Sequence, residues 1–184
     1  GWKGGCGDEF FGRGLGVNAE IIAIGDELMR GEIVDSNKAR IAERLLLHDL
    51  DCRHQVSVLD DPADMRDAFL RASQRSDFVL VSGGLGPTRD DMTTEVLSET
   101  FGRKLELHPP SLAAIEAFFA RIGREMADTN RKQAFFPEDA DVLDQEACTV
   151  SKLGVALHPL QSPPALLQGG EGCIWRCIGT RIRL

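Results

Sequence analysis

A short glycine-rich run is the part of this sequence best suited to hold a ligand. Gly83, Gly84 and Gly86 follow an apolar segment and precede Pro87 and Thr88. Glycine reaches backbone angles that are closed to other residues, and its missing side chain lets a phosphate approach the main-chain N–H groups at a helix start. The run predicts a phosphate-binding turn. The simpler alternative is a tight strand-to-helix connection that needs positive φ angles.

Acidic residues accompany this turn. Asp90 and Asp91 follow it directly, and two further acidic loops lie at residues 25–27 and 60–61. Adjacent carboxylates beside a bound phosphate can hold a divalent cation, whereas acids at the start of a helix can also cap its first turn. One of the two aspartates can cap while the other binds metal. We therefore keep both roles open.

The elements around these residues alternate between strand and helix. Apolar runs predict strands at 19–24, 52–59 and 77–82, and helical periodicity predicts helices at 37–49, 62–76 and 92–101. Parallel strands need helical crossovers, so the order predicts an α/β fold with a mostly parallel sheet and helices on both faces. Ligands bind such sheets at the carboxyl ends of the strands. The three acidic loops are expected to converge there.

Caps and core-facing positions follow from the same pattern. Ser36 is expected to cap the first helix, and Asp61 with Pro62 is expected to begin the second. Another helix is expected after Pro110, a short one at 130–135 and a strand at 141–143. The residues predicted to face the core are Ile41, Ala42, Leu45 and Leu46, then Met65, Phe69 and Ala72, and finally Leu112, Ile115, Phe119 and Ile122.

Composition narrows the class of protein. The 184-residue chain has a formal net charge of -8, which repels a nucleic-acid backbone and predicts no nucleic-acid partner. No apolar run approaches the roughly 20 residues of a membrane span, so a cytoplasmic protein without a membrane partner is expected. Its five cysteines form no CxxC pair, which favours free thiols over a zinc site.

The chain divides into three parts of different composition. Residues 1–18 are glycine-rich and are expected to be a disordered leader. Residues 19–144 carry the periodic pattern of an α/β domain. Residues 145–184 hold few acids and clusters of proline and glycine, so they are expected to be an atypical tail that packs poorly.

Two longer motifs give a specific resemblance. Residues 25–28 (GDEL) with Gly31, Asp35, Ser36 and Asn37, followed by residues 82–93 (SGGLGPTRDDMT), resemble the molybdopterin-binding-like domain of the CinA (competence/damage-inducible protein A) family. Residues 130–134 and Pro137 are similar to a later segment of that family. The resemblance covers residues 19–143 and implies a three-layer αβα fold.

The resemblance also implies a set of site residues. Asp60 falls where related adenylyltransferases place a catalytic aspartate, Asp90 or Asp91 falls at their second one, and Asp26 takes a ligand-facing position. The predicted catalytic residues are Asp60, Asp90 and Asp91, of which the last two are also the predicted metal ligands. The predicted binding residues are Gly25, Asp26, Glu27, Gly83, Gly84, Gly86, Pro87, Thr88 and Thr93.

Three functions remain open on this basis. The family implies metal-dependent hydrolysis of an ADP-ribose-type pyrophosphate by a homo-oligomer, with a divalent metal ion as cofactor. The alternative is a molybdopterin-binding or adenylyl-transfer module. The third is an inactive truncated fragment, because the family's Gly-Thr-Ala-Pro-Gly loop and Leu-Pro-Gly-x-Pro segment are not found after Asp144. The family's second domain, which resembles nicotinamide mononucleotide amidohydrolases, is not expected here.

Overall fold

The computed structural model describes residues 18–47, 50–142, 154–158 and 180–183. Its main sheet has the strand order β2-β1-β3-β7-β8-β6. The first three strands are β1 (Asn18–Ile24), β2 (Asp51–Val58) and β3 (Phe78–Ser82), and β1 pairs in parallel with both neighbours. The first half of the sheet is thus the parallel arrangement that the sequence predicts.

The other half of the sheet comes from later in the chain. β7 (Gly154–His158) pairs antiparallel with β3 and parallel with β8 (Thr180–Arg183), and β8 pairs antiparallel with β6 (Asp141–Val142). Both β7 and β8 lie within the range that we expected to be a tail, where the sequence showed no strand pattern. The three-part division of the chain stays a prediction, and the expected leader at 1–17 lies outside the described residues.

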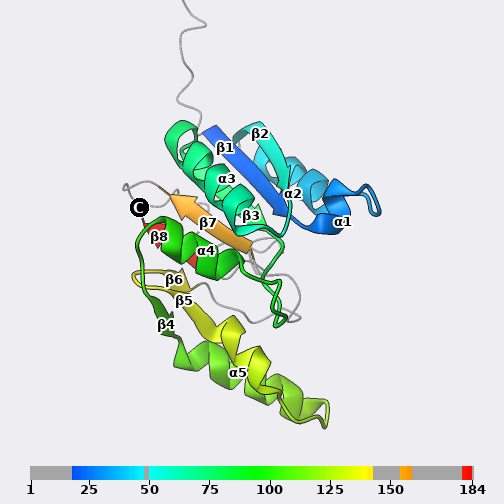
Figure 1. Cartoon of the computed structure of the whole chain (residues 1–184), viewed down its shortest axis with the longest axis vertical. Coiled ribbons are helices and arrows are strands. Elements are labelled where there is room, and N and C mark those ends of the chain that lie inside the picture. The colour runs from blue at the N-terminus through cyan, green and yellow to red at the C-terminus, as the bar shows by residue number, and fades with distance from the viewer. Residues whose placement is uncertain (1–17, 48–49, 143–153, 159–179, 184) are drawn as a thin grey trace, which may run out of the picture.

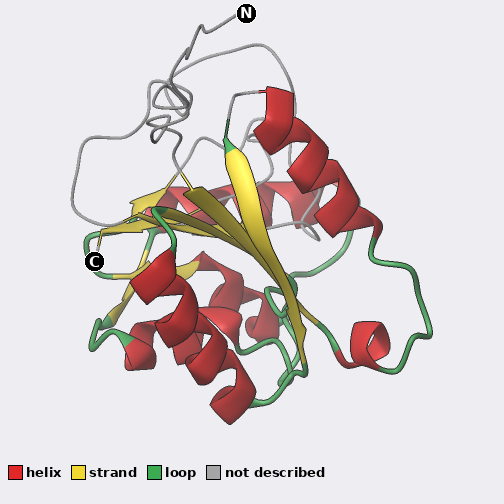
Figure 2. Ribbon diagram, turned by 90° about the horizontal axis from the view of Figure 1, so that it is seen from above, coloured by secondary structure: helices red, strands yellow, loops and turns green. Residues whose placement is uncertain are grey.

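Helices cover both faces of the sheet (Figure 2). α2 (Ser36–Leu47) packs on one face, where Ile41 and Leu45 share a core cluster with Ile21 and Leu80. α3 (Pro62–Arg75) and α4 (Thr93–Thr100) pack on the other. Their core consists of Ile22, Ile24, Met65, Ala68, Phe69, Ala72, Val79, Val81, Val96 and Leu97. Successive residues of each central strand thus pack on opposite faces of the sheet, because the side chains of a strand alternate between its two faces.

The remaining elements form an arm beside the sheet (Figure 1). It contains β4 (Leu105–Leu107), α5 (Pro109–Arg121), the 3₁₀ helix η1 (Asp128–Ala134) and β5 (Phe135–Pro137), with β4 and β5 paired antiparallel. α1 (Asp26–Met29) is a single turn that directly follows β1. The sequence predicted α5 and η1 but neither of the three-residue strands, which are too short to show a period.

Several local predictions are confirmed. Asp61 caps α3, since its Oδ1 accepts the N–H groups of Ala63 and Asp64 at 2.9 and 3.2 Å, and Pro62 opens the helix. The expected core residues Met65, Phe69 and Ala72 are fully buried. Removing a buried side chain as large as that of Phe69 costs about 3–5 kcal/mol of stability.

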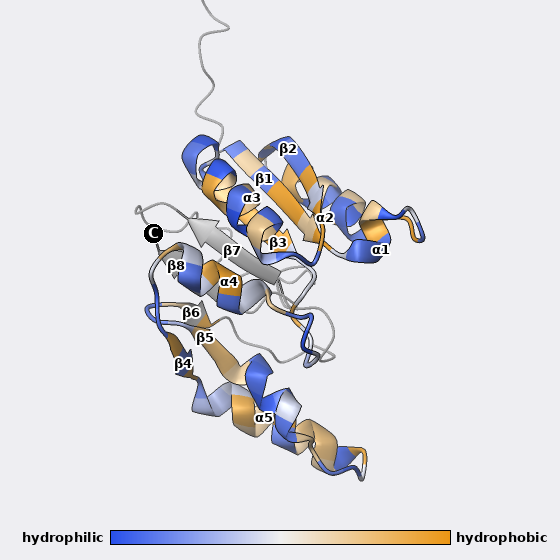
Figure 3. Ribbon diagram, in the orientation of Figure 1, coloured by the Kyte–Doolittle hydropathy of each residue, from blue (hydrophilic) through white to orange (hydrophobic). Residues whose placement is uncertain are grey.

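Three local predictions are wrong. Asp35 rather than Ser36 supplies the cap of α2, because its Oδ1 accepts the N–H of Lys38 at 2.9 Å. Leu46 is 74% exposed, because one step along a helix rotates it away from the face of Leu45. Ile122 is 45% exposed, because α5 has ended before it and it follows the helix as the C-cap. Figure 3 shows the alternation of hydrophilic and hydrophobic residues along these helices.

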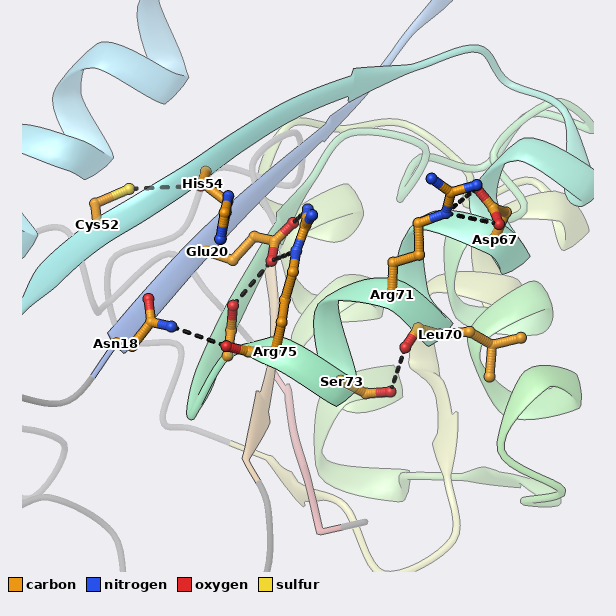
Figure 4. Close-up of polar contacts among 10 residues, drawn as sticks. Asn18, Glu20, Cys52, His54, Asp67, Leu70, Arg71, Ser73 and Arg75 are labelled. Carbon is orange, nitrogen blue, oxygen red and sulfur yellow. Dashed lines mark hydrogen bonds and ion pairs between the residues drawn. The ribbon is translucent and has the colours of Figure 1, made fainter.

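One charge lies inside the sheet. Glu20 on β1 is 1% exposed and accepts hydrogen bonds from Arg75 Nε and Ser76 Oγ, each at 2.9 Å. Figure 4 shows the Glu20 and Arg75 side chains pointing toward one another. Burial raises the pKa of Glu20, but the hydrogen bonds from Arg75 and Ser76 outweigh it, so the net shift is downward. Glu20 is therefore a paired, ionised carboxylate at the end of the sheet remote from the glycine-rich turn.

No helix among the described residues combines the length and the apolar character that crossing a membrane would require.

Candidate functional site

The site is built where β1, β2 and β3 end. These strands lie side by side in parallel, so the loops that follow them share one edge of the sheet. The N–H of Gly25, at the end of β1, donates to Val58 O at 3.1 Å, which ties this loop to the end of β2. The loops with Asp26, Asp60 and Gly84 therefore meet, as the sequence predicted.

Asp26 and Asp60 hold one another in place. The N–H of Asp26 donates to Asp60 Oδ2 at 3.0 Å, and the N–H of Asp60 donates to Asp26 Oδ1 at 3.1 Å. The second oxygen of Asp26, Oδ2, accepts from Arg30 at 2.6 Å. Both carboxylate oxygens of Asp26 are thus engaged by the protein. Asp26 thus supports the site geometry, and its ligand-facing role stays a prediction.

Asp60 faces the glycine-rich turn. A Cβ placed on Gly84 would stand 3.6 Å from Asp60 Oδ1, so this oxygen lies next to the turn. Burial is the main factor that raises the pKa of Asp60, and the negative charges of Asp26, Glu27 and Asp91 raise it further, against a hydrogen bond from Asp26 that lowers it. A carboxylate with a raised pKa is a better proton acceptor than a free aspartate.

The first two glycines of the turn are required by contacts within the protein. Gly83 has φ +104°, and a Cβ there would overlap Ile24 O. Gly84 has φ +61°, and its Cβ would overlap Thr93 Oγ1. Thr93 is buried and donates from Oγ1 to Gly83 O at 2.8 Å. The tight strand-to-helix connection accounts for both glycines without a ligand.

Gly86 is constrained by Asp91. A Cβ on Gly86 would stand 2.5 Å from Asp91 Oδ2, and the same oxygen accepts from Thr88 N at 2.8 Å and Thr88 Oγ1 at 2.5 Å. Burial raises the pKa of Asp91, but hydrogen bonds from Thr88 and Gly86 and the charge of Lys132 lower it overall. Asp91 is thus an ionised carboxylate that accepts hydrogen bonds from the turn.

Asp90 and Asp91 differ in their exposure to solvent. Asp90 is exposed, whereas Asp91 is half-buried. Neither caps α4 with its side chain, because α4 begins after Met92 and has no side-chain cap. Helix capping, the alternative role considered from the sequence, is therefore not seen at these two residues.

The described residues contain no cluster of three or more His, Cys, Asp or Glu side chains arranged to hold a metal ion. Asp90 and Asp91 nevertheless supply carboxylates at the edge of the turn, and Mg²⁺ is commonly bound by one or two carboxylates together with substrate phosphates. The donor set therefore fits a cation that a phosphorylated ligand helps to hold. In the described part of the chain it does not form a complete protein cage.

The other predicted binding residues line the same edge. Gly25 precedes α1, and a Cβ on it would lie 2.8 Å from Glu27 Oε1, so the Glu27 carboxylate folds back over Gly25. Pro87 is half-buried and Thr88 is exposed in the turn. All of the predicted site residues thus lie in the loops that follow β1, β2 and β3, in the first two residues of α1 or at the first residue of α4.

Sequence reasoning missed the contribution of η1. Lys132 Nζ donates to Thr88 O at 3.1 Å, and Gln133 Nε2 donates to Leu85 O at 3.4 Å. Two consecutive side chains of η1 therefore support carbonyl groups of the glycine-rich turn. The motif at 130–134 was visible in the sequence, but nothing in the residue types connected it with a turn so much earlier in the chain.

Comparison with known proteins identifies the family. Residues 20–167 match the family described as "Probable molybdopterin binding domain". The crystal structure of a CinA protein of unknown function from Thermoplasma acidophilum is 32% identical and has a TM-score of 0.66, covering 73% of this chain and 79% of that one. The chain belongs to the CinA family. The expected three-layer αβα fold is confirmed.

Curated CinA relatives are longer than this chain. A "Putative competence-damage inducible protein" of Clostridioides difficile (strain 630) is 42% identical over 153 residues, which are 80% of this chain and 37% of the relative. A "CinA-like protein" of Anaeromyxobacter sp. (strain Fw109-5) is 45% identical over 127 residues, 69% of this chain and 31% of the relative. The chain thus spans about a third of these CinA proteins. The family match also continues beyond Asp144, the boundary expected from composition.

Proposed function

We propose that this CinA domain binds a nucleoside diphosphate sugar of the ADP-ribose type at the glycine-rich turn and hydrolyses its pyrophosphate bond. The observation that carries the proposal is the position of Asp60, a half-buried carboxyl held by Asp26 beside Gly84. A proton acceptor next to a phosphate-binding turn is the arrangement that water attack on phosphorus requires.

The proposed reaction is a hydrolysis. A water oxygen attacks one phosphorus atom, the bridging P–O bond breaks, and the bridging oxygen leaves on the other phosphate, giving AMP and ribose 5-phosphate. Asp60 accepts a proton from the attacking water, and Asp26 keeps the Asp60 carboxylate in position. The turn between Gly83 and Thr88 orients the pyrophosphate.

A divalent cation would supply charge neutralisation for the pyrophosphate when bound. Asp90 and the Asp91 oxygen that faces away from Thr88 would hold it, together with ligand oxygens. The requirement for this cation is part of the proposed function, and the turnover experiment described next tests it.

The test is turnover of ADP-ribose by the full 184-residue chain across a Mg²⁺ and Mn²⁺ titration, with AMP measured chromatographically. We expect metal-dependent AMP release that the Asp60→Asn variant loses. Absence of turnover in the wild-type chain would contradict the hydrolase and leave two alternatives, an inactive fragment or a binding module.

Molybdopterin is the second candidate ligand, and the description of the matched family favours it. The same turn would hold the pterin phosphate without hydrolysis or serve adenylyl transfer. Pterin fluorescence of protein incubated with molybdopterin separates this candidate from an inactive fragment, which should bind neither compound.

A further inference from the structure

Lys132 places a positive charge against the glycine-rich turn. Its Nζ lies 3.1 Å from Thr88 O and 3.2 Å from Glu95 Oε1, and its side chain is 27% exposed. Burial raises the pKa of Asp91, whereas hydrogen bonds from Thr88 and Gly86 and, as the smallest factor, the positive charge of Lys132 lower it. An ammonium group has three N–H donors, so one remains after the two contacts with Thr88 and Glu95.

The rest of the site is strongly acidic. Asp26, Glu27 and Asp91 act together on Asp60, and each raises its pKa through negative charge. A pyrophosphate would add further negative charge to this edge of the sheet. Of the nearby cations, Arg89 directly follows Thr88 and is exposed, and Arg30 is paired with Asp26 at 2.6 Å. Lys132, by contrast, reaches the main chain of the turn itself.

We propose that Lys132 is a phosphate-binding residue of the glycine-rich turn. The inference rests on the proposed phosphorylated ligand and adds to it a specific side chain from a different part of the fold. The third N–H of Lys132 would donate to a phosphate oxygen while the other two keep their contacts. A hydrogen bond from a charged donor contributes roughly 1.5–3 kcal/mol, so its loss should weaken binding at least about tenfold.

The competing role for Lys132 is mechanical support of the turn, and a set of variants separates the two. Lys132→Gln removes the charge but keeps an N–H donor for Thr88 O. Lys132→Arg keeps the charge. Gln133→Leu removes the neighbouring support at Leu85 O without changing any charge. Lys104→Gln removes the charge of an exposed lysine that immediately precedes β4.

The probes are inorganic pyrophosphate and ADP-ribose, titrated calorimetrically into the full chain, with the melting temperature of each variant measured in parallel. We expect Lys132→Gln to bind both probes at least about tenfold more weakly. Lys132→Arg and Lys104→Gln should stay close to wild type, whereas Gln133→Leu, which loosens the turn without removing a charge, should weaken binding less than Lys132→Gln does. Unchanged affinity of Lys132→Gln overturns this inference alone. An equal loss in Gln133→Leu also overturns it, because support rather than charge would then matter.

A labelling experiment on the wild-type chain keeps the inference testable if Lys132→Gln does not fold. Saturating pyrophosphate should protect Lys132, but not Lys104, from an amine-reactive reagent, as measured by peptide mass spectrometry. Equal labelling of Lys132 with and without bound pyrophosphate overturns the inference. A wild-type chain that binds neither probe overturns the proposed function together with it.

Discussion

Asp26 and Asp60 each accept a hydrogen bond from the main-chain N–H of the other, at 3.0 and 3.1 Å. The contact is reciprocal, so each carboxylate fixes the loop that carries the other. The loops after β1 and β2 are joined in this way immediately beside the glycine-rich turn. In the proposed hydrolysis, Asp26 would therefore be a positioning residue that acts through Asp60.

The first prediction concerns Asp26. Asp26→Ala removes one half of the reciprocal contact and the acceptor for Arg30, so the melting temperature should fall by an amount equivalent to about 1–2 kcal/mol. Turnover of ADP-ribose should fall mainly in kcat, because the main chain of Asp60 loses its acceptor and the loop that carries Asp60 shifts, while the glycine-rich turn is unchanged. Stopped assays over a range of substrate concentrations give kcat and KM separately.

The matched control for this prediction is Asp67→Ala. Asp67 forms an ion pair with Arg71 on α3 at 2.8 Å, with the same spacing of four residues as Asp26 and Arg30 (Figure 4), but remote from the site. Exposed pairs of this kind contribute little, so Asp67→Ala should change neither stability nor kcat much. Equal effects of the two variants would show that Asp26 acts only as a surface ion pair.

The second prediction concerns Gly84. A side chain at Gly84 would collide with Thr93 Oγ1, so Gly84→Ala should destabilise the domain by more than the roughly 1–2 kcal/mol that φ +61° alone imposes. Gly102→Ala isolates the backbone effect, since Gly102 has φ +64° and an added Cβ would meet nothing within 4 Å. Thermal denaturation should show a clearly larger loss at Gly84, and equal losses would contradict the contact argument.

The Thr93 contact decides what a Gly84 variant can test. If Gly84 served only to admit a phosphate, a bulky residue there would impair ligand binding more than folding. The contact makes folding the larger effect, because Thr93 is buried and its hydroxyl is already bonded to Gly83 O. Binding measured on a Gly84 variant is therefore informative only where the variant is shown to be folded.

The third prediction separates the acidic residues by role. Asp60→Asn should reduce turnover roughly 10²- to 10⁴-fold, the range for loss of a general base, while leaving metal dependence and ligand affinity nearly intact. Asp91→Asn should instead abolish the metal-dependent part of the rate, because the amide lacks the charge that a hard cation prefers. Rates across a metal titration for both variants test the assignment. Unchanged rates in both would remove these aspartates from catalysis.

Asp90→Asn is the natural companion to this experiment. Asp90 is exposed and Asp91 is seated on the turn, so the two substitutions test which carboxylate contributes more to the cation. Asp91→Asn retains an oxygen that can accept from Thr88, and so the turn should survive. A lowered melting temperature with unchanged kinetics in Asp91→Asn would show that this residue serves only the turn.

The fourth prediction is a pH dependence of stability that comes from Glu20. Its pKa in the folded state is lowered by Arg75 and Ser76 despite burial, so the unfolded chain takes up the proton first as the pH falls. The stabilisation is complete above the ordinary glutamate pKa and is lost as the pH drops through the lower pKa of the folded state. Urea denaturation of wild type and Glu20→Gln from neutral to acid pH measures it.

For this comparison, we expect Glu20→Gln to be less stable than wild type at neutral pH by roughly 1.5–3 kcal/mol, the range for hydrogen bonds to a charged group, reduced by the exposure of Arg75. The difference should shrink toward acid pH, because protonation of Glu20 removes the same charge. A difference that stays constant with pH would show that shape rather than charge determines the role of Glu20.

The first half of the fold was predictable from the sequence for a physical reason. The segments that became β1, α3 and β3 bury one face or both, so their apolar residues repeat with the period of the element, as at Met65, Phe69 and Ala72. β7 and β8 lie in sequence rich in proline and glycine and show no such period. Their pairing with the sheet depends on contacts that local pattern does not record.

The candidate site was predicted as a set of loops but not as a set of contacts. Parallel strands place their carboxyl ends together, and this rule alone brings Asp26, Asp60 and Gly84 to one edge. The side-chain partners were not predictable. That Asp26 turns to the Asp60 N–H, or that Lys132 reaches Thr88, depends on how separate elements pack, and residue types alone carry no information about it.

The order in which strands join the sheet bears on how the domain is assembled during synthesis. β2, β1 and β3 come from one continuous stretch of chain linked by α1, α2 and α3, whereas β7 joins β3 only after α4, α5, η1 and the strands between them have been made. Contacts between segments that are close in sequence carry a smaller entropic cost of loop closure, so they form sooner. A chain emerging from the ribosome can therefore close Asp26 onto Asp60 while the strand that will cover the outer edge of β3 is still untranslated.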